Sequence, residues 1–381
     1  MQYRKLGRSG LEVSAISLGC EGFIGMGEAE AKAMFTTAID AGVNFIDMYS
    51  SDPDMRSLVG RMLADHPDFH IQGHLCSIWQ DGQYKCSRNM DEVKIAFDDQ
   101  MQRLGRSRLD VGMIHYIDSL ENWNIVWNGP VMEYARSLKA DGRIGYIGIS
   151  SHNPVVAREA ALTGEIDVLL FSINPAFDML PPDEDVMRLF KESTYTEARH
   201  NFNPEPVALY ELCEREGVGI DVMKAFGGGN LLDKKLSPFG CALTPVQCLD
   251  YALTRPGVAA VMCGCRTLEE LKVCLSWCDA DEKARDYSTV LSSQKKFTWS
   301  GQCMYCGHCA PCPKGIKVAD VNKFLNLAAA HSEIPETLRE HYAALVHHAS
   351  ECIQCGACEK RCPFQVPVRQ KMTEAASRFG F

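Results

Sequence analysis

Short apolar runs alternate with stretches of helical period along residues 14–279. Eight of these runs are typical of buried strands, over 14–19, 43–47, 69–75, 109–115, 143–150, 166–173, 218–224 and 257–264. Amphipathic helical patterns lie between them, and two of these patterns end at Gly105 and Gly142, a residue type at which helices commonly stop. Strands that alternate with helices in this way indicate parallel β-α units.

The number of these units favours a closed barrel. Eight strands over a span of ~265 residues match the usual size of a (β/α)8, or TIM, barrel. The competing architecture is an open doubly wound sheet, but no GxGxxG turn follows the first strand. We therefore predict an α/β fold with a (β/α)8 barrel over residues 1–279. A long Pro-, Asp- and Arg-rich stretch, 176–205, would lie at its C-terminal face, either as a substrate lid or as a plain surface insertion.

Composition narrows the class of protein. Of 381 residues, 46% are hydrophobic, which excludes a disordered or fibrous chain, and the net charge of −10 argues against a nucleic-acid partner. No apolar run approaches the ~18 residues that would span a bilayer. The first residues, MQYRKLGRSGLEV, contain no apolar segment typical of a signal peptide. We predict a cytoplasmic protein that acts on a small molecule, with no nucleic-acid or membrane partner.

The 18 cysteines fall into two groups. Ten are scattered through mostly apolar segments, where cysteine behaves as a small buried hydrophobe. The other eight form two runs, each closed by a Cys-Pro pair: Cys303, Cys306, Cys309 and Cys312, then Cys352, Cys355, Cys358 and Cys362. This usage fits a reducing, oxygen-poor (anaerobic) compartment and metal-bound thiolates rather than disulfides.

The spacing of the two runs predicts two [4Fe-4S] clusters. The second run has the bacterial ferredoxin spacing, and the first differs by one residue before its last cysteine. Three thiolates on a tight loop reach one cube, and the cysteine before proline reaches the other, so Cys362 joins the first run and Cys312 joins the second. Zinc is the alternative, although four cysteines this close crowd one tetrahedral ion. We predict an α-helical ferredoxin-like domain over 299–381, after a linker or docking helix over 280–298.

Taken together, the two parts resemble a known family. The segments YRKLGRSGLEVSAISLG, GVNFID, LDVGMIH, KADGRIGYIGIS and PGVAAVMCG occur in the order found in the aldo/keto reductases, in the branch that carries a C-terminal ferredoxin-like domain. This resemblance covers essentially the whole chain. It implies a (β/α)8 fold, a site at the C-terminal ends of the strands and, usually, NADP-dependent carbonyl reduction.

The resemblance also implies a catalytic set of Asp, Tyr, Lys and His. Asp47 and His115 match its Asp and His. Asp52 stands where the Tyr would fall, Tyr49 lies nearby but out of register, and His74 replaces the Lys. The proton donor of the family and the residue that tunes it are therefore both changed.

The nucleotide pocket implied by the resemblance is partly present. Gly264 and Arg266 are in place, and Ser150 and Ser151 occupy positions expected to contact the carboxamide. The adenine-binding Glu-Asn pair is replaced by Val273 and Cys274, and Met223 stands at the position of an aromatic. The Gly-rich residues 227–230 could approach a phosphate-bearing cofactor such as a flavin, or form a plain turn. NADP, a flavin or neither remains open.

Strand-end positions place these polar side chains at the barrel mouth: Glu21, Asp47, Tyr49, Asp52, His74, His115, His152 and Lys224. In one interpretation His74 or His115 is the general acid, Asp47 sets its tautomer and Lys224 stabilises an oxyanion. In the other, two His and one carboxylate hold a divalent metal.

The cysteine runs decide which function we expect. Hydride transfer from NADPH requires no iron–sulfur relay, so two one-electron carriers beside a changed NADP pocket indicate electrons that arrive singly. We expect an oxidoreductase that acts on a small organic substrate, with a ferredoxin or another redox protein as partner. The alternative is a non-catalytic electron-transfer or scaffold subunit with a degenerate barrel.

Overall fold

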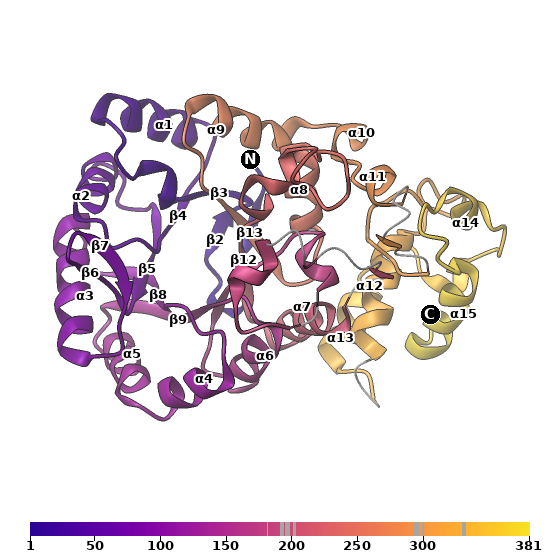
Figure 1. The fold of residues 1–381 in the computed structure, drawn as a ribbon. Coiled ribbons are helices and arrows are strands. Elements are labelled where there is room, and N and C mark those ends of the chain that lie inside the picture. Colours follow the sequence, from indigo (N-terminus) through magenta and orange to yellow (C-terminus); the bar gives the residue numbers. More distant parts are fainter. Residues whose placement is uncertain are drawn as a thin grey trace.

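The computed structural model describes residues 1–180, 182–190, 194, 199–200, 203–292, 297–298, 301–329 and 333–381. Eight parallel strands close into a barrel (Figure 1). In barrel order they are β3 (Ile16–Gly19), β4 (Phe45–Met48), β5 (His70–Leu75), β8 (Leu109–Ile114), β9 (Ile144–Ser151), β10 (Val168–Ser172), β12 (Gly219–Met223) and β13 (Val258–Cys263). The predicted barrel is confirmed, and each strand falls within one residue of a predicted apolar run.

Helices surround the strands, as the alternating pattern predicted (Figure 1). They are α1 (Glu28–Asp40), α2 (Pro53–Met62), α3 (Met90–Leu104), α4 (Leu120–Trp127), α5 (Pro130–Ala140), α6 (Pro154–Leu162), α7 (Pro204–Glu216), α8 (Pro245–Leu253) and α9 (Leu268–Leu275). Five of them begin at proline, which is tolerated at a first helical position because its missing N–H has no partner there. Gly105 ends α3 with a φ of 63°, the left-handed conformation that glycine adopts readily.

The N-terminal end of the barrel is covered by the hairpin β1 (Tyr3–Lys5) and β2 (Glu12–Ser14). Inside, a small cluster that includes Phe45, Val111, Met113, Val168 and Leu170 is buried, while a larger apolar cluster lies between strands and helices. Buried polar side chains interrupt this core along β4, β5, β8 and β12. They position the candidate site described below.

The C-terminal region is helical and lies beside the barrel (Figure 1). Its helices are α10 (Glu282–Arg285), α11 (Ser288–Ser292), α12 (Val318–Ala329), α13 (Glu336–Ala343), α14 (Ala357–Arg361) and α15 (Val368–Phe379). Helix α12 packs against α15 and against the barrel helix α7, to which Lys323 adds a 2.6 Å ion pair with Glu214. The insert between the cysteine runs therefore docks the small region onto the barrel.

Two predicted connecting segments are only partly described. The linker predicted over 280–298 contains α10 and α11, and residues 293–296 of it lie outside the described residues. The predicted lid, 176–205, contains the short 3-10 helices Phe177–Met179 and Val186–Phe190, while 181, 191–193, 195–198 and 201–202 lie outside. A short parallel pair of β11 (Arg199–His200) and β14 (Phe297–Thr298) joins the two segments.

In the part of the chain that the structure describes, no helix combines the length and the apolar character needed to cross a membrane.

Candidate active site

Three buried polar side chains meet at the C-terminal ends of adjacent strands. Asp47 lies on β4, His74 on β5, and His115 directly follows β8; their exposed fractions are 4%, 2% and 7%. Because β4, β5 and β8 are consecutive parallel neighbours, their carboxyl ends open on the same side of the barrel. The structure thus brings together the three residues that the sequence placed on adjacent strands.

These side chains form a linear hydrogen-bonded relay that ends on a tyrosine. Asp47 Oδ1 lies 2.8 Å from His74 Nε2, and His74 Nδ1 lies 2.6 Å from His115 Nδ1. The other ring nitrogen of His115, Nε2, is hydrogen-bonded to the hydroxyl of Tyr84. Tyr84 is half-buried, whereas the other three members are buried. The relay therefore connects a buried carboxylate to a phenol at the mouth.

The direction of donation follows from the chemistry of the groups. An ionised Asp47 only accepts, so His74 Nε2 donates to it and His74 Nδ1 must accept from His115 Nδ1. His115 Nε2 then accepts the O–H of Tyr84. Burial lowers the pKa of His115 well below its ordinary value, and electrostatic interactions with His74, Arg88, His152 and Lys224 lower it further. A neutral His115 is the form that this pattern requires.

Sequence reasoning missed Tyr84, which lies on a hairpin inserted after β5. The hairpin pairs β6 (Ser77–Gln80) with β7 (Gln83–Cys86) through the turn residues Asp81 and Gly82, whose φ values are 54° and 72°. An Asp-Gly pair is the preferred sequence of such a two-residue turn, and this is the signal that could have revealed the hairpin. Burial raises the pKa of Tyr84, which therefore stays protonated in the ordinary pH range.

Arg88 fixes the exit of this hairpin to the end of β8. Its Nη2 donates to the carbonyl oxygens of His115 and Tyr116, both at 2.9 Å. At the entry, the Ser77 hydroxyl donates to the Tyr49 carbonyl at 2.6 Å. These bonds hold the β6–β7 hairpin over the mouth, so Tyr84 is positioned by both ends of its own hairpin.

Tyr49 and Asp52, the residues closest to the missing family tyrosine, have other roles in the structure. The Tyr49 ring stacks on His115 at 6.3 Å between centroids, and among the described residues its hydroxyl makes no hydrogen bond. Asp52 caps α2 by accepting the Met55 N–H at 2.8 Å. Tyr49 thus packs against the relay without joining it.

The remaining mouth residues lie around the relay. His152 Nδ1 pairs with Asp118 Oδ2 at 2.9 Å. Lys224 follows β12 with a φ of 58°, its Nζ lies 5.8 Å from the Phe190 ring centroid, and burial lowers its pKa. Within the described residues Lys224 forms no ion pair, so it provides a partly buried positive charge near His115.

The hydrogen bonds of the relay contradict the alternative interpretation, in which two His and one carboxylate hold a divalent metal. Both ring nitrogens of His74 are hydrogen-bonded, to Asp47 and to His115, so His74 has no lone pair left for a cation. The groups form a line rather than converging on one point. Across the described ranges, no set of three or more His, Cys, Asp or Glu side chains is arranged to hold a single metal ion.

A second buried carboxylate supports the inner end of the relay. The Gln72 amide nitrogen donates to Asp47 Oδ1 at 2.9 Å and to Asp221 Oδ2 at 2.7 Å. Asp221 lies on β12 and is fully buried. Burial raises its pKa well above the ordinary range, and the charge of Asp47 raises it further. Asp221 is therefore held in its protonated form.

We expect Asp221→Asn to stabilise the protein more at pH 8 than at pH 5. Because the pKa of Asp221 is raised on folding, the native state binds an extra proton, and stability falls as the pH rises from ~3.9 towards the raised pKa. Asparagine keeps the shape and cannot ionise. Thermal unfolding at both pH values tests this, and the melting temperature should rise by about 1–2 °C for each kcal/mol gained. The exposed Asp65→Asn is the control, and an equal gain at both pH values would contradict a protonation effect.

Of the predicted nucleotide-binding residues, Ser150 and Ser151 lie on β9, the neighbour of β8, whereas Gly264 and Arg266 follow β13. The Ser150 hydroxyl accepts the Tyr116 N–H at 2.8 Å, and the Ser151 hydroxyl donates to Asp118 at 3.2 Å, so both are already engaged. Arg266 is 73% exposed and lies 3.7 Å from Glu21. A Cβ on Gly264 would lie 3.8 Å from the Cβ of Glu21, an ordinary van der Waals contact.

The N-terminus of α9, which follows Gly264, is closed by the chain itself. Thr267 caps the helix by accepting the Glu270 N–H at 3.2 Å, and Glu270 accepts the Arg266 N–H at 2.7 Å. A Cβ on Gly22 would lie 1.7 Å from the Cys265 carbonyl oxygen, so only glycine lets the loop after β3 pack on this turn. A carboxylate therefore occupies the place where a helix N-terminus commonly holds phosphate.

The two cysteine runs line two separate cavities. The last cysteine of each run lines the cavity of the other run. One cavity is lined by Cys303, Cys306, Cys309 and Cys362, and we call it the inner cavity. The other, which we call the outer cavity, is lined by Cys312, Cys352, Cys355 and Cys358. Apolar side chains make up most of the remaining walls. Four thiols around an apolar cavity are the donor set of a [4Fe-4S] cube, so the residues fit that group.

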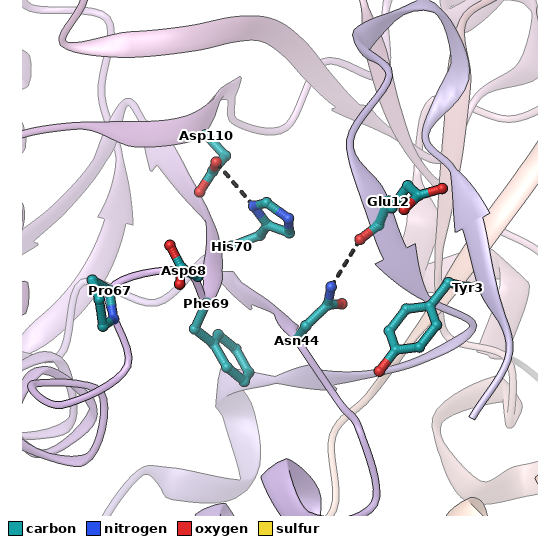
Figure 2. A pocket seen from close by; sticks show the side chains of 8 residues that line it. All are labelled: Tyr3, Glu12, Asn44, Pro67, Asp68, Phe69, His70 and Asp110. Atoms are coloured by element: carbon teal, nitrogen blue, oxygen red, sulfur yellow. Dashed lines mark hydrogen bonds and ion pairs between the residues drawn. The ribbon is translucent and has the colours of Figure 1, made fainter.

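An open polar groove of about 560 Å³ lies at the other end of the barrel (Figure 2). It is lined by Tyr3, Glu12, Asn44, Pro67, Asp68, Phe69, His70 and Asp110. His70 Nδ1 pairs with Asp110 at 3.0 Å at the N-terminal ends of β5 and β8. In barrels this end serves stability, whereas the loops at the C-terminal face carry the chemistry, so the relay is the candidate site.

Comparison with known proteins gives the family. The sequence profile described as the aldo/keto reductase family matches residues 15–244, more than half of the chain, and a 4Fe-4S dicluster domain matches residues 302–367. The chain belongs to the aldo/keto reductase family. It is an oxidoreductase of aldo/keto reductase type with a 4Fe-4S dicluster domain, which confirms the resemblance stated from the sequence.

Individual relatives of this aldo/keto reductase are distant. The "Uncharacterized oxidoreductase YqkF" of Bacillus subtilis (strain 168) is 25% identical over 311 residues, 78% of this chain and 97% of that protein. The L-glyceraldehyde 3-phosphate reductase of Escherichia coli (strain K12) is 26% identical over 196 residues, 47% of this chain and 54% of that protein. An aldo-keto reductase from Bacillus halodurans, solved in its holo form, shares the fold at 20% identity and a TM-score of 0.57, covering 75% of this chain and 94% of that one.

Proposed function

We propose that this aldo/keto reductase reduces a small organic substrate with a polarised carbonyl at the barrel mouth, and that Tyr84 exchanges the proton on the substrate oxygen. The hydrogen-bonded relay from Tyr84 through His115 and His74 to Asp47 is the observation that carries this proposal. A barrel that served only as a scaffold would have no need of a buried carboxylate connected to a mouth phenol, because burying such groups costs free energy.

The relay has two forms that differ by one proton. In the form with Asp47 ionised, each group donates towards Asp47, and the Tyr84 oxygen faces the substrate as an acceptor. With one more proton on Asp47, every hydrogen bond reverses and Tyr84 donates its O–H to the substrate. Delivery of that proton shifts one proton at each link, from His115 to Tyr84, from His74 to His115 and from Asp47 to His74. No group needs to become a buried imidazolium during this transfer.

Reduction of a carbonyl to an alcohol takes up two electrons and two protons. The relay supplies the proton that ends on oxygen, and solvent supplies the one that ends on carbon. The [4Fe-4S] clusters, when bound, would supply one-electron transfer from a reduced carrier of the ferredoxin class. Lys224, a partly buried positive charge, would favour negative charge that develops on the substrate oxygen.

The cysteines that would hold the clusters are the inner set, Cys303, Cys306, Cys309 and Cys362, and the outer set, Cys312, Cys352, Cys355 and Cys358. For NADP or a flavin, the candidate contacts remain Ser150, Ser151, Gly264 and Arg266. Engaged serines and the carboxylate at the start of α9 favour a protein electron donor over a nucleotide.

Anaerobic purification followed by titration with two reductants tests the proposal. We expect about eight iron and eight sulfide per chain, because two cubes hold that number. Reduced ferredoxin should bleach the visible absorbance of the clusters, and NADPH should not, because the place of its phosphate is occupied. Addition of an activated 1,2-dicarbonyl compound under the same conditions should then restore the absorbance.

The controls separate the parts of the proposal. Bleaching by NADPH would show that the nucleotide pocket functions and would overturn the ferredoxin donor while leaving the relay. Iron near zero, or zinc in its place, would overturn the electron path. Clusters that are never reoxidised by any substrate would favour the non-catalytic electron-transfer subunit instead.

A further inference from the structure

Arg255 is a buried cation at the junction between the barrel and the inner cavity. It lies in the turn between α8 and β13 and is only 5% exposed. Its Nη2 donates to the carbonyl oxygen of Met304 at 2.6 Å. Met304 lies between Cys303 and Tyr305 and lines the inner cavity. The guanidinium therefore touches the loop that carries three of the four inner cysteines.

No carboxylate neutralises this charge at contact distance among the described residues. The further acceptors of Arg255 are the Tyr251 carbonyl, the Thr254 hydroxyl and the Tyr287 hydroxyl, at 3.0–3.1 Å. Its Cζ also lies 4.5 Å from the Tyr251 ring centroid and 5.3 Å from that of Tyr305. All these partners are formally neutral. Buried arginines are normally paired with an acid, because an unpaired buried charge is costly.

The carboxylates near Arg255 form their hydrogen bonds and ion pairs with other residues. Asp178 accepts the hydroxyls of Tyr210 and Tyr251 at 2.6 and 2.7 Å, and burial raises its pKa to about 6. Asp286 pairs with His308, which also lines the inner cavity, at 3.0 Å. Neither carboxylate contacts the guanidinium. Within the described ranges, the charge of Arg255 thus lacks a carboxylate counter-ion at contact distance.

We propose that Arg255 is the counter-cation of the inner cluster and holds its reduction potential above that of the outer cluster. This inference rests on the proposed function, since it requires both clusters. A cube with four thiolate ligands is an anion, and reduction adds one more negative charge, which a buried cation stabilises. Net charge around a cluster is one of the factors that set its potential.

Among the described residues that line the outer cavity, none is a buried cation. Its lining cations are Arg361 and Arg369, both exposed, and Arg369 pairs with Glu359 at 2.7 Å. Solvent screens exposed charges, and an acid partner cancels them, so their effect on a cluster is weak. The outer cysteine Cys355 is itself exposed. Electrons that enter at the outer cluster would therefore pass to the inner cluster, which has the higher reduction potential and lies against the barrel.

Redox titration of the anaerobically purified full chain, followed by electron paramagnetic resonance, tests this role. In Arg255→Gln the equilibrium constant for reduction of the inner cluster should fall at least tenfold, which is 59 mV for a one-electron couple. The outer cluster should not change, and Cys355→Ser identifies its signal. Arg255→Lys, which keeps the charge, should restore most of the potential, and Tyr287→Phe, which removes only a hydroxyl, should leave it unaltered.

Arg285→Gln is the matched control. Arg285 is a half-buried cation over the Trp277 ring at 4.5 Å, and its carboxylate partner is Asp250 at 3.9 Å. We expect both potentials to be unchanged in this variant. An inner potential that is equally low in Arg255→Gln and Arg255→Lys would mean that hydrogen bonding, not charge, is responsible, and no shift in a fully loaded Arg255→Gln would overturn the role. If Arg255→Gln does not bind the inner cluster, the reduction potentials of Arg255→Lys and Tyr287→Phe still show whether the charge or a hydrogen bond sets the inner potential. Absence of iron from the unaltered protein would instead overturn the proposed function.

Discussion

Tyr84→Phe is expected to lower kcat by about 10²–10⁴-fold, the usual contribution of a positioned general acid or base. Phenylalanine keeps the ring that packs at 5.4 Å from His115 and removes only the hydroxyl that joins the relay. Substrate binding should change little, because the ring and the hairpin stay in place. Steady-state kinetics with reduced ferredoxin and an activated dicarbonyl substrate would separate kcat from KM.

Tyr49→Phe is the matched control for this variant. Tyr49 packs edge-on to Tyr84 at 6.1 Å and stacks on His115, so both substitutions remove one hydroxyl from the same aromatic cluster. Only the Tyr84 hydroxyl belongs to the relay. We expect kcat of Tyr49→Phe to remain within a few-fold of the unaltered enzyme. The reverse result, a large loss for Tyr49 and a small one for Tyr84, would contradict the role of Tyr84 and make Tyr49 the proton donor.

The relay also predicts a spectroscopic signature that packing alone would not produce. The hydrogen between Tyr84 and His115 should resonate far downfield in the proton NMR spectrum and disappear in Tyr84→Phe. His74→Gln should move it, because His74 is hydrogen-bonded to the other ring nitrogen of His115. An unchanged downfield spectrum in both variants would contradict a continuous relay.

The barrel and the inner half of this site could be predicted because they depend on local pattern. Each strand is a short apolar run with a helix after it, and the closed parallel order brings the ends of β4, β5 and β8 to one side. Asp47, His74 and His115 follow from that order alone. The crossed arrangement of the cysteine runs also follows from spacing, since three close thiolates share one loop while the cysteine before proline leaves it.

The other half depends on contacts between distant segments. Tyr84 reaches His115 only because a hairpin folds back over the mouth, and its register decides which side chain points inward. Gln72 joins Asp47 to Asp221 across the barrel interior, a pairing between residues far apart in the chain. In the sequence, Arg255 cannot be distinguished from an ordinary surface arginine at the end of a helix. In the structure, it is buried where it contacts Met304 and Tyr287. No periodicity or spacing marks such contacts in advance.

Replacing the last cysteine of each run should remove the cluster of the other run. Cys362 lines the inner cavity with Cys303, Cys306 and Cys309, whereas Cys312 lines the outer one. We therefore expect Cys362→Ser to lose the inner cluster and Cys312→Ser the outer one, each retaining roughly half of the iron. Iron analysis gives the loss, and electron paramagnetic resonance of the reduced proteins shows which signal remains.

Cys309→Ser and Cys358→Ser identify the two signals, because each of these residues lies within the tight loop of its own run. The spectrum of Cys362→Ser should match that of Cys309→Ser, and the spectrum of Cys312→Ser should match that of Cys358→Ser. Matches within each run, Cys312 with Cys309 and Cys362 with Cys358, would contradict the crossed arrangement. Because the inner cavity lies against the barrel, Cys362→Ser should also abolish substrate reduction, although the altered residue lies in the distal run.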